Sequence, residues 1–283
     1  MTPSLFGSIE ALRQAVAGWR RAGESIGFVP TMGALHEGHL ALVRAAKAEC
    51  RRAVVSIFVN PKQFGPNSDF DRYPRDLDGD LAKLASVGAD AVFAPSVEMM
   101  YPPGSATTVS VAGLTEGLCG PHRPGHFDGV ATVVTKLLNQ AAADAAYFGE
   151  KDWQQLQVVR RLVRDLDMTV RIVGIPTVRE ADGLAMSSRN LLLTPDERRR
   201  AAAIYRVMTE AARDLARGEA ADTVIARGKA ALESAGFGPI DYLSVVEAES
   251  LKPVARVTGP SRIAVAAWLG KTRLIDNLPV EPA

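Results

Sequence analysis

The chain has 283 residues, in which 33 Lys and Arg balance 32 Asp and Glu to a formal net charge of +1. Hydrophobic residues make up 47% and charged residues 23%, which is the composition of an ordinary globular protein. The charge balance excludes a histone-like grip on nucleic acid, and no apolar run reaches the ~20 residues that a membrane-spanning helix needs.

Cysteine usage restricts the class of protein further. Cys50 and Cys119 are the two cysteines of the sequence, which excludes a disulfide scaffold and a cysteine-based zinc site. The first residues lack the basic segment of a secretory signal. We therefore expect a soluble cytoplasmic protein that binds neither nucleic acid nor a membrane.

In chain order, β-branched apolar runs alternate with helical periods over the first two thirds of the sequence. The predicted strands cover 25–29, 54–59, 91–94, 145–148 and 170–173. The predicted helices cover 9–21, 40–50, 77–87, 130–140 and 151–165. This alternation predicts an α/β fold, a Rossmann-like parallel sheet with strand order 3-2-1-4-5 and helices on both faces. The Pro- and Gly-rich segment 97–128 is longer than a plain connection, which indicates a functional role.

The pattern changes after about residue 176. Two predicted helices come first and three short predicted strands follow, at 196–216, 221–235, 242–246, 263–269 and 274–276. We therefore expect two domains, a Rossmann-like domain over 1–177 and a smaller C-terminal α+β domain over 178–283.

The strongest local motif joins the first strand to the next helix and reads PTMGALHEGH from Pro30 to His39. Ligands bind at the carboxyl ends of the strands in open parallel sheets. Gly33 lets the backbone approach a ligand closely, and Gly38 permits a tight turn. His36 and His39 share a helical face and can donate hydrogen bonds to phosphate oxygens. The alternatives are two ordinary histidines or a metal pair, although no further carboxylate or cysteine completes a ligand set.

A second motif, FGEKDWQQ from Phe148 to Gln155, has the same strand-to-helix position. Lys151, Asp152 and Gln155 can point the same way because they lie three or four residues apart. A cation in the first helical turn opposes the helix dipole by up to about 1 kcal/mol, which an anion bound there would explain. In the alternative interpretation, Lys151 is a solvated surface group.

A third motif, MSSRN from Met186 to Asn190, places hydroxyls beside an arginine, as in a flexible clamp for nucleotide phosphates. Gln63 follows the second strand and offers an amide suited to a small hydroxy acid. Asp80 could help to hold Mg²⁺, or it could be a solvated helical carboxylate. The sequence lacks a P-loop, a GxGxxG after the first strand and a GxSxG elbow.

The HxGH turn and the later MSSR segment resemble the HIGH and KMSKS motifs of the nucleotidyl-transferring superfamily that includes class I aminoacyl-tRNA synthetases. Adding FVNPKQF at 58–64, RPGHF at 123–127 and GEKD at 149–152 narrows the resemblance to pantothenate synthetases, the pantoate–β-alanine ligases. These motifs span residues 30 to 190 in order.

The resemblance implies an enzyme of pantothenate biosynthesis, a homodimer that uses ATP and Mg²⁺. Pantoate is adenylated with release of pyrophosphate, and β-alanine then displaces AMP. The resemblance assigns catalysis to His36, His39, Lys151 and Arg189, and pantoate binding to Gln63 and Gln155, with His39 as the proton donor. ATP would contact Met32, Gly33, Ala34, Leu35, His36, Glu37, Gly38, His39, Gly149, Glu150, Lys151, Asp152, Val178, Met186, Ser187, Ser188 and Arg189. The first domain would hold nucleotide and pantoate, and the second would act as a lid.

The sequence departs from the family pattern at Gly79, where an acidic residue often precedes Asp80. Lys83, one helical turn later, could then contact phosphate directly. Another nucleotidyl transferase, such as a cytidylyltransferase, shares the HxGH turn but does not predict Gln63 and Gln155. A non-catalytic ATP-binding module would not need His39, Lys151 and Arg189, and a small tRNA synthetase would need a basic anticodon-reading domain.

Overall fold

A computed structural model describes residues 2–65, 70–71 and 73–283 of the chain, which divides into two compact units. The first unit comprises Met1–Ala112, Arg123–Glu150 and Val158–Pro176, and the second comprises Gly113–His122, Lys151–Gln157 and Thr177–Ala283. Two short segments that precede Pro176 in the chain therefore belong to the second unit. No helix in the described part of the chain is both long and apolar enough to cross a membrane.

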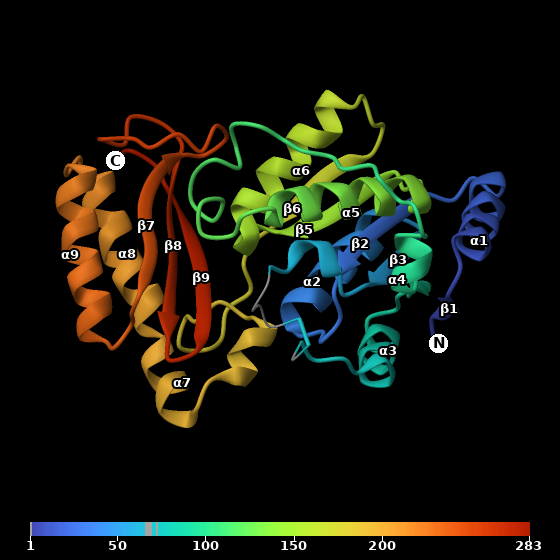
Figure 1. Cartoon of the computed structure of the whole chain (residues 1–283), viewed down its shortest axis with the longest axis horizontal. Coiled ribbons are helices and arrows are strands. Elements are labelled where there is room, and N and C mark those ends of the chain that lie inside the picture. The colour runs from blue at the N-terminus through green and yellow to red at the C-terminus, as the bar shows by residue number, and fades with distance from the viewer. Residues whose placement is uncertain (1, 66–69, 72) are drawn as a thin grey trace. The chain divides into compact units, whose positions relative to one another are not determined.

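The first unit is built on a six-stranded parallel sheet with the order β1-β4-β3-β2-β5-β6 (Figure 1). Its strands are β1 (Ser4–Phe6), β2 (Ile26–Thr31), β3 (Arg52–Ile57), β4 (Ala91–Phe93), β5 (Ala145–Gly149) and β6 (Arg171–Ile175). The order predicted for the five strands from β2 to β6 is confirmed. Strand β1 was not predicted. It is a three-residue strand beside β4 whose first two residues are exposed, and so short a run carries no alternation.

Helices flank this sheet and leave its central strand buried. They are α1 (Ile9–Arg21), α2 (Glu37–Glu49), α3 (Leu77–Ser86), α4 (Val97–Met100), α5 (His126–Ala141) and α6 (Trp153–Asp165), with 3-10 turns η1 (Pro61–Gln63) and η2 (Glu150–Asp152). Ile26, Phe28 and Val29 of β2 are fully buried, and neighbouring strand residues point to opposite faces, so β2 is covered on both sides. One core cluster joins Val43 and Ala46 of α2 to the strands.

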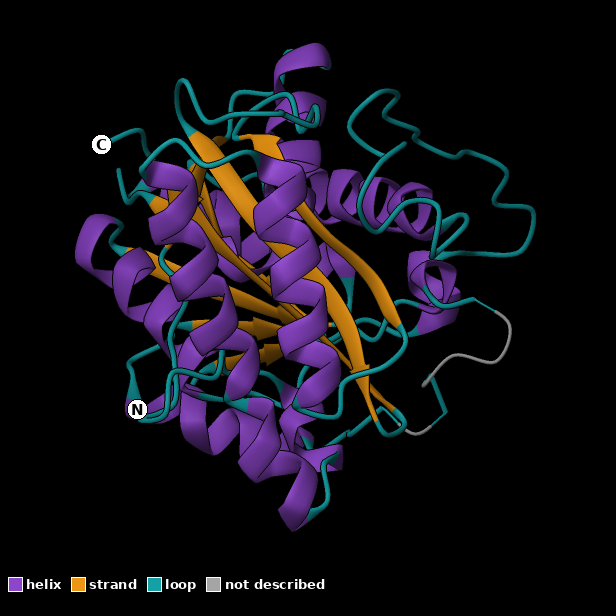
Figure 2. Ribbon diagram, turned by 90° about the vertical axis from the view of Figure 1, so that its left-hand side faces the viewer, coloured by secondary structure: helices purple, strands orange, loops and turns teal. Residues whose placement is uncertain are grey.

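The second unit contains a three-stranded antiparallel sheet of order β7-β8-β9, as the predicted α+β domain requires. Its elements are η3 (Ser188–Leu192), α7 (Pro195–Ala201), α8 (Ala203–Ala216), α9 (Ala221–Ser234), β7 (Ile240–Glu247), β8 (Ser261–Leu269) and β9 (Thr272–Val280). Figure 2 shows α8 and α9 side by side across one face of this sheet. Apolar side chains of these helices and strands form a separate core cluster.

Several predicted boundaries were wrong for identifiable reasons. The helix after β2 begins at Glu37 rather than residue 40, because His36 supplies its amino-terminal cap. The predicted helix 196–216 is divided between α7 and α8 at Ala202. The strand predicted over 274–276 extends over Thr272–Val280, because its buried polar side chains are satisfied by hydrogen bonds.

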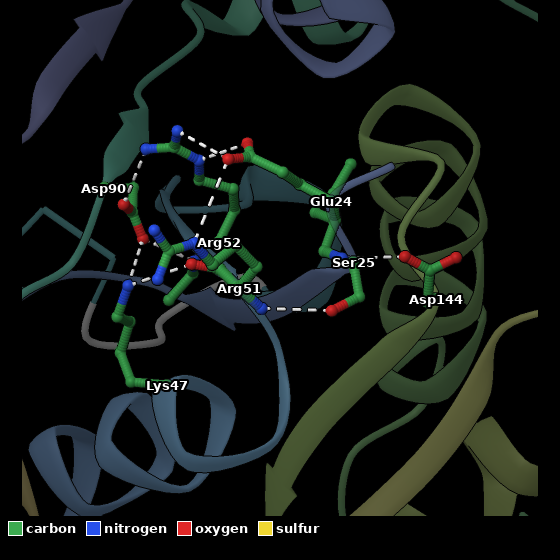
Figure 3. Close-up of polar contacts among 9 residues, drawn as sticks. Glu24, Ser25, Lys47, Arg51, Arg52, Asp90 and Asp144 are labelled. Carbon is green, nitrogen blue, oxygen red and sulfur yellow. Dashed lines mark hydrogen bonds and ion pairs between the residues drawn. The ribbon is translucent and has the colours of Figure 1, made fainter. Parts of the chain in front are cut away.

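Charged side chains connect the amino ends of the strands of the first unit (Figure 3). Arg52 at the start of β3 donates to Glu24 at 2.7 and 3.0 Å and to Asp90 at 3.1 Å. Asp90, which precedes β4, also accepts from the backbone N–H of Ala53 at 2.8 Å and from Lys47 at 2.8 Å. These contacts fix the starts of neighbouring strands relative to one another. Because the strands are parallel, the positions of their ends at the opposite edge of the sheet are fixed as well.

The Arg52 contacts make the stability of the first unit depend on pH. The hydrogen bond from Arg52 lowers the pKa of Glu24 below its ordinary value of 4.5. A carboxyl whose folded pKa is depressed contributes stability above its unfolded pKa and loses that contribution as pH falls through the folded pKa.

We therefore expect Arg52→Met to lower the melting temperature by roughly 2–4 °C at neutral pH. The difference from the wild type should shrink as the pH falls below 4.5. Arg164→Met is the control, since Arg164 pairs with its exposed neighbour Asp165. Thermal unfolding monitored by circular dichroism measures the melting temperatures of both variants and of the wild type. A difference between Arg52→Met and the wild type that stays constant across this pH range would contradict the expectation.

Candidate functional site

The loop after β2 is held by the carboxylate of Asp80 in the first turn of α3. This side chain is 1% exposed and accepts hydrogen bonds from the backbone N–H groups of Ala34 and Leu35, both at 2.8 Å. Gly33 has φ +82°, and a Cβ there would stand 3.1 Å from Asp80 Oδ2. Lys83 donates to the carbonyl of Leu35 at 2.9 Å. Asp80 and Lys83 thus fix the backbone of the first motif from a neighbouring helix.

The Asp80 carboxylate holds the loop, and its part in a magnesium site stays a prediction. Each of its oxygens accepts one backbone hydrogen bond, and Gly79 adds no second carboxylate. Across the described residues there is no group of three or more His, Cys, Asp or Glu side chains that could hold a metal ion. Asp80 is therefore interpreted as a residue that positions the loop.

The amino end of α2 is capped by the ring nitrogens of His36 and His39. His36 Nδ1 accepts from the backbone N–H of Gly38 at 3.2 Å, and His39 Nδ1 accepts from the backbone N–H of His36 at 3.3 Å. The ring centroids are 4.1 Å apart. Because Nδ1 is the acceptor in both contacts, each neutral ring carries its hydrogen on Nε2. Both imidazoles are thus fixed as Nε2–H donors at a helix amino end, where anions bind.

Gln63 is held by a buried polar network at the end of β3. Its side chain accepts from Asn60 Nδ2 at 3.0 Å and donates to Met32 Sδ at 3.1 Å. Asn60 is 1% exposed, caps η1 through Lys62 N–H and accepts from the hydroxyl of Tyr101 at 2.8 Å. Burial raises the pKa of Tyr101 to about 12, so this hydroxyl remains a donor at neutral pH.

The start of α5 fixes the backbone of Gln63 from the other side. His126 Nδ1 contacts the carbonyl of Gln63 at 2.9 Å, so Nδ1 carries the hydrogen and Nε2 accepts from Arg123 at 3.0 Å. Gly129 lies so close that a Cβ there would stand 2.2 Å from the carbonyl oxygen of Lys62. A side chain at this position would therefore displace the η1 turn.

In the second unit, Lys151 and Asp152 open the turn that leads into α6. The Lys151 ammonium lies 3.8 Å from Asp152 Oδ2, and its side chain is 18% exposed. The backbone carbonyl of Lys151 accepts from Asn277 Nδ2 at 2.9 Å. Gln154 is buried and donates to the carbonyls of Leu114 and Gly117, whereas Gln155 is half-buried.

The MSSRN motif forms the η3 turn and the residues that lead into it, and backbone and side-chain hydrogen bonds hold this segment. Met186 N–H donates to the carbonyl of Val178 at 3.0 Å, which pairs two residues predicted to contact ATP. Ser187 caps η3 by accepting from the backbone N–H of Arg189 at 3.2 Å. Asn190 donates to the carbonyl of Ala185 at 3.1 Å. The segment therefore forms a hydrogen-bonded turn, and its function as a phosphate clamp stays a prediction.

The predicted site residues are divided between the two units. The first unit brings together the turn from Met32 to His39 with Gln63 and Asp80, and it also contains Gly149 and Glu150 at the end of β5. The second unit contains Lys151, Asp152, Gln155, Val178 and Met186–Arg189.

Several residues to which the sequence assigned no role of their own hold the predicted ones in place. Asn60 could have been recognised, because an Asn before Pro61 is typical of a cap. Tyr101 and Asn277 gave no signal, since their partners lie 41 and 126 residues away in the chain. His126 belongs to the RPGHF motif, but its contact with Gln63, 63 residues away, could not be read from that motif.

Comparisons with known proteins show the family to which the chain belongs. The family described as pantoate-beta-alanine ligase matches residues 4–279. A pantothenate synthetase of Chelativorans sp. (strain BNC1) is 54% identical over 100% of both chains. The crystal structure of pantothenate synthetase from Thermus thermophilus superposes with a TM-score of 0.93 at 48% identity, covering 99% of this chain and 100% of that one.

A second solved structure carries ligands. The pantoate-beta-alanine ligase from Francisella tularensis, described as complexed with beta-gamma ATP and beta-alanine, has a TM-score of 0.84 at 34% identity. The match covers 98% of this chain and 97% of that one.

The close approach of Gly129 to η1 gives a test of the Gln63 position. Gly129→Ala should raise the KM for pantoate about tenfold or more with little change in the KM for ATP, because the added methyl pushes against backbone and such overpacking costs typically 1–3 kcal/mol. Steady-state kinetics in each substrate measure this. Gly18→Ala is the matched control, since a Cβ there meets no atom within 4 Å and Gly18 has no assigned part in the reaction. Equal effects of Gly129→Ala on both KM values would contradict the expectation.

Proposed function

The chain belongs to the pantoate–β-alanine ligase family and ligates pantoate with β-alanine to give pantothenate, and we propose that it does so through a pantoyl adenylate. In the first step a pantoate carboxylate oxygen attacks the α-phosphorus of ATP, and the bond to the β-phosphate breaks to release pyrophosphate. In the second step the β-alanine amine attacks the acyl carbon, loses a proton and displaces AMP. The ligands named for the Francisella protein, beta-gamma ATP and beta-alanine, support these two co-substrates.

The observation that carries the proposal is the paired histidine cap of α2. Carboxylate and triphosphate are both anionic, so the first step needs positioning and charge stabilisation more than a covalent nucleophile. The caps fix His36 and His39 as Nε2–H donors beside the helix amino end. We assign ATP contact to Met32–His39, with His39 donating to a phosphate oxygen as charge develops.

We assign the cationic part of the machinery to the second unit. Lys151 and Arg189 would stabilise the phosphates, with hydroxyls from Ser187 and Ser188. Gly149–Asp152 and Val178 would contact adenosine, and Met186 would close over the phosphates. Helix ends supply about 0.3–1 kcal/mol each at a surface, so these cations must supply most of the stabilisation. The domain over 178–283 would then act as the lid over the nucleotide.

Gln63 and Gln155 are assigned to pantoate. The Gln63 amide is fixed on both sides, since its oxygen accepts from Asn60 and its nitrogen contacts a sulfur, which is a weak acceptor. A pantoate oxygen is a better partner for that N–H than the sulfur of Met32. The Gln63 N–H would therefore exchange the sulfur of Met32 for a pantoate oxygen on binding, which supports Gln63 as a donor to pantoate.

The remaining expectations concern magnesium, assembly and location. Magnesium would enter with ATP as a phosphate complex and neutralise part of its charge, and Asp80 is the one side chain predicted to help hold it. The cytoplasmic location is supported by the two free cysteines, Cys50 and Cys119. The homodimer rests on the family resemblance.

The test follows product release with ATP, Mg²⁺ and pantoate, before and after addition of β-alanine. We expect pyrophosphate without free AMP in the first stage and AMP only after β-alanine is added. Release of AMP and pyrophosphate together, and only in the presence of β-alanine, would contradict a separate adenylation step.

The same assay measures the role of His39. His39→Ala should lower the pyrophosphate rate by roughly 10²–10³, the range for loss of one transition-state donor. His122→Ala is the control, because its ring lies near Asp241 in the second unit and has no assigned part in the reaction. A loss below about threefold in His39→Ala would remove His39 from the mechanism.

A further inference from the structure

Two adjacent polar residues of β9 are almost completely buried. Asp276 is 3% and Asn277 is 4% exposed, although β9 is an edge strand of the sheet β7-β8-β9. Burying such groups is costly unless they are hydrogen-bonded. Asp276 Oδ1 accepts from the backbone N–H of Asn277 at 2.8 Å, so part of their hydrogen bonding lies within the pair itself.

The side chain of Asn277 holds the backbone at Lys151. Its Nδ2 donates to the carbonyl of Lys151 at 2.9 Å, and its Oδ1 accepts from Arg262 at 2.7 Å. The Arg262 guanidinium lies 3.5 Å from the ring centroid of Trp153, whose Nε1 donates to the carbonyl of Ala248 at 2.7 Å. The start of α6 is thus attached to the sheet by its backbone at Lys151 and by its first aromatic side chain.

The side chain of Asp276 holds the segment that leads to Met186. The Asp276 carboxylate accepts hydrogen bonds from both terminal nitrogens of Arg179, at 2.7 and 2.9 Å. Arg179 also donates to the carbonyl of Gly183 at 3.0 Å and lies 4.2 Å from the ring centroid of Tyr205. Arg179 pairs with Ala185 as an isolated bridge, and Met186 pairs with Val178. The Arg179–Asp276 contact therefore fixes the turn from which Ser187–Arg189 extend.

We propose that Asp276 and Asn277 are positioning residues for the adenylation step. Neighbouring strand residues point to opposite faces of a sheet, so one short piece of β9 holds the Lys151 turn through Asn277 and the 178–186 segment through Asp276, each from its own face. Asn277 acts through Lys151, and Asp276 acts through Arg179. The inference rests on the proposed roles of Lys151 and of Met186–Arg189 in binding the nucleotide.

Stability alone is a weak explanation for this pair. A buried Arg–carboxylate pair often contributes little net stability compared with apolar residues of similar size. The same unit contains a comparable pair, Asp241 and Arg273, joined at 2.7 Å, with Trp268 donating to Asp241 at 3.1 Å. Asp241 contacts no residue of the proposed site, so it provides a matched control.

The first experiment is a double-mutant cycle with Asn277→Asp and Lys151→Ala, measured as the rate of pyrophosphate release at saturating ATP and pantoate. Asn277→Asp keeps an acceptor for Arg262 but places an oxygen against the Lys151 carbonyl. We expect Asn277→Asp to lower the rate about tenfold in the wild type and less than about twofold in Lys151→Ala, because coupled residues are not additive.

Equal losses from Asn277→Asp in both backgrounds, with a slow Lys151→Ala enzyme, would overturn the positioning of Lys151 and leave its proposed role intact. An unchanged rate in Lys151→Ala alone would overturn both the role and the inference built on it.

The second experiment compares Asp276→Asn with Asp241→Asn. Both remove one carboxylate paired with an arginine, buried at Asp276 and 12% exposed at Asp241, and both should lower the melting temperature. We expect Asp276→Asn to raise the KM for ATP about fivefold or more with the KM for pantoate unchanged, and Asp241→Asn to change neither. Arg179→Lys retains the charge but loses the two-pronged contact, and it should raise the KM for ATP in the same way. Unchanged KM values in Asp276→Asn and Arg179→Lys, or equal changes in the Asp241→Asn control, would overturn the inference.

Discussion

Parallel strands end together at one edge of a sheet, and this constraint determines where the first unit can place reactive groups. Charged contacts around Arg52 and Asp90 fix the starts of the strands (Figure 3). The opposite edge therefore has defined positions for the turn after β2 and the η1 turn after β3. The ends of the strands fix where these two turns begin, so the turns can position reactive groups without further helices or strands at that edge.

Buried polar side chains then fix the backbone of each turn. Asp80 binds two consecutive N–H groups after β2, Asn60 and His126 hold η1, and Asn277 holds the carbonyl of Lys151. Asn60 caps η1 locally, and in the other cases a side chain from a distant part of the sequence satisfies a backbone group that regular structure leaves unpaired. This arrangement suits a reaction between two anions, since fixed donors do not have to reorganise as charge develops.

The sequence was sufficient to predict the alternating first unit, the order of its main strands and the α+β character of the second unit, because the buried strands of the first unit are continuous apolar runs. It was insufficient where polar residues are buried. Asp276 and Asn277 interrupt the apolar pattern of β9, so that strand was predicted too short. His36 is an uncommon helix cap, so α2 was predicted to begin three residues late. Arg179 and Asp276 are 97 residues apart, and no local pattern reports such a contact.

Transfer of oxygen from pantoate to AMP tests the adenylate mechanism most directly. Pantoate labelled with ¹⁸O in both carboxylate oxygens would be turned over with ATP and β-alanine, and the AMP would be analysed by mass spectrometry. If pantoyl adenylate forms, the carboxylate oxygen that attacked the α-phosphorus leaves with AMP, so each AMP carries one ¹⁸O and pantothenate retains the other. Unlabelled AMP would show that pantoate never bonds to the α-phosphorus, and would contradict the mechanism.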